Sequence, residues 1–168
     1  MTATTHRSHR SRHLPLVALL TFTGAGVPAH ATVAEWPEFR GPTGQGHTAR
    51  DAAQLPLQWS ATENVRWKQA LPGTGWSSPV VARGRIFLTT GVTTAPHRAS
   101  LRALALDAAT GRVLWNTELV PDADISPQTI HKKNSPASPT PLIEGDRVYI
   151  HFGHHGTACL DLDGKIVW

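Results

Sequence analysis

The sequence predicts an all-β fold, a β-propeller of four-stranded antiparallel blades, from two observations. Short apolar runs rich in β-branched residues alternate with turn sequences such as ARGR and DAATGR, as expected for antiparallel strands joined by tight turns. The pattern of residues 78–115 then recurs. Pro79 returns as Pro141 and Trp115 as Trp168, a spacing of 62 residues at the front and 53 at the back. Four short strands in each period of about fifty residues are typical of a propeller blade.

The first 31 residues predict a secretory signal peptide. A basic, polar start is followed by an apolar core over residues 14–27 and by Ala29-His30-Ala31, which fits the small-x-small cleavage pattern. We expect cleavage after Ala31 and general-route export to the periplasm or beyond, with no membrane span left in the mature chain. No cysteine lies near this site, so lipid attachment there is excluded.

Residues 32–77 form a segment rich in tryptophan, proline and glycine, in which prolines and glycines forbid a long helix. Its large apolar side chains predict packing against the first blades, with sugar stacking as the less favoured alternative. These side chains are Trp36, Phe39, Trp59 and Trp67. Because Trp67 lies 48 residues before Trp115, it is interpreted as the last strand of an earlier, degenerate unit.

Two blades follow, at residues 78–119 and 138–168, with an inter-blade loop at residues 120–137. Propellers close with roughly four to eight blades. The second blade is therefore expected to be truncated and the sequence to be the N-terminal part of a longer protein.

The recurring polar and aromatic residues are predicted to have structural roles. Asp107 is placed to accept hydrogen bonds from amides of the turn that follows it, and Gly111 can adopt a positive φ in that turn. Trp115, on the outermost strand, is large enough to bridge two blades. Cys159 takes the place of Ala105 and is expected to be a small buried residue.

The pattern Ala-x-Asp-x-x-Thr-Gly-x-x-x-Trp over residues 105–115 resembles the tryptophan-docking repeat of quinoprotein-type propellers. These are the pyrroloquinoline quinone (PQQ) dehydrogenases and the non-enzymatic BamB-like proteins of the bacterial envelope. The second copy is one residue shorter and departs at the turn, and the resemblance covers about residues 35–168. The docking residues that it implies are Ala105, Asp107, Thr110, Gly111, Trp115, Asp161, Gly164 and Trp168.

The resemblance implies two alternative functions. The favoured one is a non-enzymatic binding or scaffold module of the cell envelope, which engages an envelope protein or a polymer through propeller loops. The other is a PQQ-dependent dehydrogenase with PQQ and calcium as cofactors. In such enzymes the cofactor rests on a disulfide between adjacent cysteines, whereas this chain has one cysteine. Asn134 and Asp124 lie on the expected face without a matching motif, so no catalytic residue is assigned.

The same face is expected to carry the longer loops and to gather His97, His131, His154 and His155. Imidazoles can hold a transition metal. However, these four lack metal-ligand spacing on one element, so solvated loop histidines are the favoured interpretation and His131, His154 and His155 are minor metal candidates. Without residues 1–31 the net charge falls from +4 to +1, and no basic stripe remains to bind nucleic acid.

Overall fold

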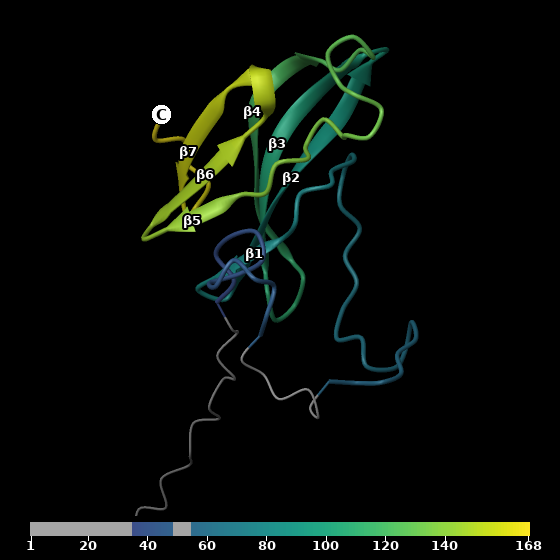
Figure 1. Ribbon diagram of the computed structural model, residues 1–168, viewed down its shortest axis with the longest axis vertical. Coiled ribbons are helices and arrows are strands. Elements are labelled where there is room, and N and C mark those ends of the chain that lie inside the picture. Colours follow the sequence, from purple (N-terminus) through teal and green to yellow (C-terminus); the bar gives the residue numbers. More distant parts are fainter. Residues whose placement is uncertain (1–34, 49–54) are drawn as a thin grey trace, which may run out of the picture. The chain divides into compact units, whose positions relative to one another are not determined.

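The computed structural model describes residues 35–48 and 55–168, in which two antiparallel sheets contain all the strands (Figure 1). The predicted signal peptide lies outside these residues. The first sheet has the order β1-β2-β3-β4, with bounds Val80–Ala82, Arg85–Ala95, Arg98–Asp107 and Val113–Asp124. The second has the order β5-β6-β7, with bounds Leu142–Glu144, Arg147–His151 and Thr157–Asp161, and a short 3-10 helix, η2, at Gly153–His155.

The end of the chain occupies the position of a fourth strand in the second sheet. Leu160 pairs with Ile166, the Cys159 amide donates to the Trp168 carbonyl at 2.8 Å, and the Val167 amide donates to the Cys159 carbonyl at 2.8 Å. Residues 166–168 therefore lie beside β7 as β4 lies beside β3. The two sheets share one strand order, which confirms the predicted all-β propeller blades.

The two sheets pack around one hydrophobic core, which includes Val80, Phe87 and Leu101 of the first and Val148 and Leu160 of the second. Burial of these side chains is the main force that holds the blades together. The short strands β1 and β5 are neighbours. This is the arrangement expected of the innermost strands of adjacent blades.

Two regions extend the strands further than the sequence pattern indicates. Residues 92–99 belong mainly to β2 and β3, which are joined by a tight turn at Pro96 and His97, where His97 has φ 60°. The β-branched residues of this stretch favour extended backbone, and their polarity concealed the strand. Similarly, β4 continues to Asp124, into the range predicted as the inter-blade loop. Pro121 is tolerated there because β4 is an edge strand of its sheet.

The Trp-rich segment packs against the blades at only some of its aromatic residues. Trp36 pairs with Val81 through two backbone hydrogen bonds of 2.7 and 2.8 Å, and Trp67 is half-buried. Phe39 and Trp59 remain 57% and 71% exposed, so the prediction that they pack is wrong. Counting apolar side chains indicates how many need a partner but does not decide which of them find one.

Candidate functional site

The turn between β3 and β4 is closed by the carboxylate of Asp107. One oxygen, Oδ1, accepts hydrogen bonds from the amides of Ala109 and Thr110 at 3.0 and 2.8 Å and from the Thr110 hydroxyl at 2.8 Å. Gly111 completes the turn with φ 76°. These are the contacts expected from the sequence. The hydrogen bonds, above all that from the Thr110 hydroxyl, lower the pKa of Asp107.

This shift predicts a loss of stability in acid. A carboxyl whose pKa is lowered by folding stabilises the native state above its unfolded pKa of about 3.9 and loses that contribution as the pH falls through the folded value. Denaturant titrations between pH 5 and pH 2 should show a smaller acid-dependent decrease in the unfolding free energy for Asp107→Asn than for the unmodified protein. An equal decrease in both would show that Asp107 contributes nothing to it. Glu144→Gln, at an exposed carboxyl that makes no hydrogen bond or ion pair within the described residues, is the matched control.

Trp67 docks onto this turn from the Trp-rich segment. Its indole covers Gly111 so closely that a Cβ built on the glycine would lie 2.4 Å from the Cε3 atom of the ring. The indole N–H donates to the Ala108 carbonyl at 3.1 Å. Trp67 is not in a strand, contrary to the interpretation of this position as a last strand. It nevertheless makes the contact that a blade-bridging tryptophan is expected to make.

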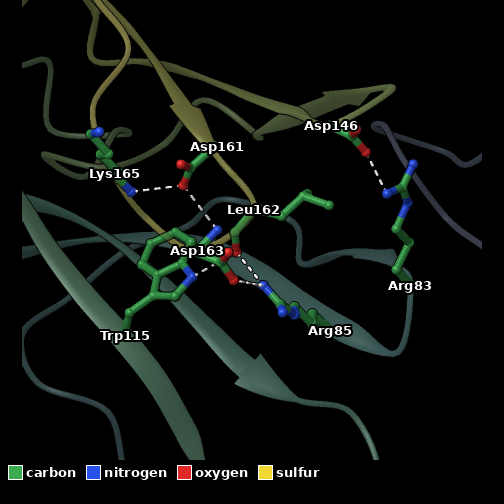
Figure 2. A network of polar contacts seen from close by, with 8 residues as sticks. All are labelled: Arg83, Arg85, Trp115, Asp146, Asp161, Leu162, Asp163 and Lys165. Carbon is green, nitrogen blue, oxygen red and sulfur yellow. Dashed lines mark hydrogen bonds and ion pairs between the residues drawn. The ribbon is translucent and has the colours of Figure 1, made fainter.

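Trp115 repeats this geometry on the second sheet (Figure 2). Its indole covers Gly164, where a Cβ would lie 2.5 Å from Cδ2, and its N–H donates to the Leu162 carbonyl at 2.9 Å. Asp161 organises this turn by accepting from the amides of Asp163 and Lys165 at 3.0 and 2.9 Å. The two docking contacts are thus equivalent, residue for residue, in consecutive units.

Arg85, which the sequence interpretation did not single out, reinforces the second contact. Its guanidinium donates to the same Leu162 carbonyl and forms an ion pair with Asp163 at 2.9 Å (Figure 2). The Arg83–Asp146 ion pair joins the first tight turns of the two sheets. These contacts place the tight turns of both blades on one face, which we call the docking face.

A second feature missed in the sequence explains the small residue at the start of each docking pattern. Ala105 is in register with Phe87 on one side and Trp115 on the other, and the two rings lie 5.9 Å apart between centroids. Cys159 occupies the same position between Tyr149 and Trp168, whose rings are 6.3 Å apart. A small side chain lets the two rings meet across it. The matched spacing of Phe87 and Tyr149 was the signal for this pair.

Trp168 keeps the backbone position of Trp115, but its side chain is 62% exposed and contacts Tyr149. Among the described residues, the complete docking geometry is made by Trp67 and Trp115.

The longer loops form a second surface, which we call the loop face: residues 125–141 and 153–156. Two cavities open there, of about 420 and 610 Å³, both within the usual range of small-molecule sites, roughly 300–1,000 Å³. His131, His154 and His155 line the smaller cavity, and His97 and His131 line the larger. The structure therefore brings the four predicted loop histidines to two cavities. Neither cavity is lined by a residue of the docking face.

Hydrogen bonds indicate which ring nitrogens of these imidazoles donate and which accept. Nδ1 of His131 accepts from the Lys133 amide at 3.2 Å, so the neutral ring carries its proton on Nε2. Nε2 of His155 donates to the Asp124 carbonyl at 3.2 Å, and its ring centroid lies 3.9 Å from that of His154. Hydrogen bonds from Ser126 are the main cause of a lowered pKa for Asp124, with smaller electrostatic contributions from Arg98 and His154.

The described residues do not fit the cofactors of a PQQ dehydrogenase. PQQ carries three carboxylates, whereas Lys132 is the single charged side chain that lines either cavity. Within residues 35–48 and 55–168, no group of three or more His, Cys, Asp or Glu side chains is arranged to hold a metal ion. Cys159 is buried and has no neighbouring cysteine for a disulfide. We therefore assign no reaction step that involves PQQ or calcium to these residues.

Comparison with known proteins identifies the family of the chain. The profile of a family described as outer membrane protein assembly factor BamB matches residues 46–168. No curated protein matches the chain. In the part of the chain that the structure describes, no helix has the length and apolarity needed to cross a membrane. The matched range spans both sheets and both docking tryptophans, and the chain therefore belongs to the BamB family of PQQ-like β-propeller proteins.

Proposed function

We propose that this protein is an exported, non-enzymatic binding module of the cell envelope, which holds another envelope component on its loop face. The observation that carries the proposal is the separation of the two faces. The docking face is occupied by contacts between blades, whereas the loop face presents two cavities that take no part in those contacts. Loops on a rigid scaffold are the usual position of binding residues. Export is supported by the sequence pattern of residues 1–31.

The hydrogen bonds in the smaller cavity favour binding over catalysis. The hydroxyl groups of Ser135 and Ser138 are the candidate nucleophiles of this cavity, but they form a hydrogen bond with each other at 3.2 Å. The Trp76 amide also donates to Ser135 at 3.1 Å. Among the described residues no hydrogen bond joins either serine to an imidazole. A serine nucleophile needs such a base to be activated, so these serines support the loop and not acyl transfer.

Site-specific photocrosslinking in the producing cells tests the proposal. A photoreactive residue at Asn134 on the loop face should give a discrete crosslinked product in the envelope fraction, because this side chain is exposed beside both cavities. The same residue at Asp146, equally accessible but on the docking face, is the matched control and should give none. Equal crosslinking from both positions, or none from Asn134, would contradict the proposal. So would recovery of the protein from the cytoplasm alone.

A further inference from the structure

The two cavities of the loop face share a wall. Ile130, His131, Asn134 and Pro136 line both of them. The cavities are therefore adjoining compartments on either side of one short stretch of the loop. A ligand long enough to cross this stretch would contact both, whereas a compact molecule would fill one.

The groups that line the cavities select for a neutral ligand. No carboxylate or guanidinium lines either cavity, and the single ammonium is that of Lys132, at the exposed wall of the larger one. A cationic ligand would find no carboxylate on either wall. An anion would find one ammonium, at the exposed wall of the larger cavity, and none in the smaller one. Because a buried or partly buried charge needs a partner, the smaller cavity in particular favours an uncharged ligand.

The polar groups that remain open suit hydroxyl groups. Within the described part of the chain the side-chain amide of Asn134 makes no hydrogen bond. Nδ1 of His131 already accepts from the Lys133 amide, which leaves Nε2–H of the neutral ring as a donor. The side-chain amide of Asn134 can both donate and accept and the His131 ring can donate, and sugar hydroxyls can pair with both kinds of group. The serine hydroxyls are already bonded within the loop.

An exposed aromatic ring stands beside the same loop. Trp76 is 61% exposed, while its amide donates to Ser135 Oγ at 3.1 Å and to the Ala137 carbonyl at 3.0 Å. Ser135 lines the smaller cavity. The backbone is thus fixed at the edge of the loop and the indole is open to solvent. The negatively charged face of such a ring attracts the C–H groups of a sugar.

We propose that the loop face binds a neutral oligosaccharide chain, with one sugar unit in each cavity and His131 and Asn134 hydrogen-bonded to the hydroxyls between them. This inference rests on the proposed function and specifies the component that the loop face holds. Imidazole and amide groups orient the hydroxyls, the proline and isoleucine side chains of the shared wall contact the apolar ring faces, and Trp76 stacks on a unit that extends beyond the smaller cavity.

Titration calorimetry of the full-length protein tests this proposal. The probes are six-unit oligomers of glucose, mannose and N-acetylglucosamine and the corresponding monomers. Oligogalacturonate serves as the acidic oligosaccharide for comparison. At least one neutral hexamer should bind, and at least about tenfold more tightly than its monomer, because the chain occupies two compartments. His131→Ala and Asn134→Ala should each weaken binding about fivefold, the usual effect of one lost hydrogen bond.

His151→Ala is the matched control. His151 lies on β6, bonds to Thr157 at 3.0 Å and lines neither cavity, so this variant should bind as the unmodified protein does. Unchanged thermal unfolding of each variant would show that lost binding is not lost folding. If the His131→Ala and His151→Ala variants bind the oligosaccharide equally well, the assignment of the sugar-binding site to these cavities would be overturned.

The remaining outcomes separate the two proposals. Binding of oligogalacturonate alone would overturn the neutral class of ligand. Failure of every oligosaccharide, together with a protein crosslinked from Asn134, would overturn the glycan and leave the loop face as a protein-binding surface. Failure of both experiments would remove the binding function itself.

Discussion

Replacing Trp115 by alanine is expected to destabilise the protein by about 3–5 kcal/mol, as large aromatic truncations at packed positions do. The indole joins the two blades through its contact with Gly164 and its hydrogen bond to the Leu162 carbonyl. It also packs on Phe87 across Ala105. Its removal leaves a cavity between the sheets and takes away one of the two hydrogen bonds to the Leu162 carbonyl, while that from Arg85 remains. Denaturant unfolding followed by circular dichroism measures the loss.

Trp59→Ala is the matched control for this substitution. Trp59 is 71% exposed, so its loss should change the unfolding free energy by less than about 0.5 kcal/mol. A decrease of less than about 1 kcal/mol for Trp115→Ala would contradict the docking role, because a packed indole contributes more than that.

The Gly164→Ala substitution should destabilise the protein by about 2–5 kcal/mol for two separable reasons. The backbone has φ 83°, which disfavours any residue with a Cβ, and the new methyl group would lie 2.5 Å from the Trp115 ring. Because the ring is fixed by its hydrogen bond to the same turn, it cannot move aside without losing the docking contact.

Gly145 separates these reasons. Its φ is 56°, but no atom lies within 4 Å of a Cβ built on it. Gly145→Ala should therefore lose about 1–2 kcal/mol, from the backbone conformation alone. In a Trp115→Ala background the effect of Gly164→Ala should fall to a similar value, since the clash is gone. Equal losses at Gly164 and Gly145 in the unmodified background would refute the close approach of the indole.

The recurrence of Asp107, Gly111 and Trp115 was enough to predict which turns would be tight and which side chains would bridge blades. Each of these residues has a local reason for its type: a carboxylate to accept turn amides, a glycine for a positive φ, a large ring to span two sheets. Trp67 departs from this local pattern. Its side chain makes the predicted contact although its backbone is not a strand.

The loop face depended more on tertiary structure. The histidines could be placed on one face from the alternation of turns, but the shared wall at His131 and Asn134 depends on the fold of the loop of residues 125–141, whose Ala137 carbonyl accepts from the amides of Trp76 and Ser77. In the same way, Arg85 and Asp163 are far apart in the sequence, and the sequence carried no signal of their pairing.

The amino-acid sequence by itself determined the strand order, the tight turns and the tryptophans that join the blades, because these depend on contacts within one repeat or between residues at matching positions of two repeats. Only the tertiary structure decided which aromatic side chains stay exposed, how far β2 and β4 extend, and where the two cavities meet. Those features depend on which surfaces remain uncovered after the blades have packed, and no local pattern specifies that.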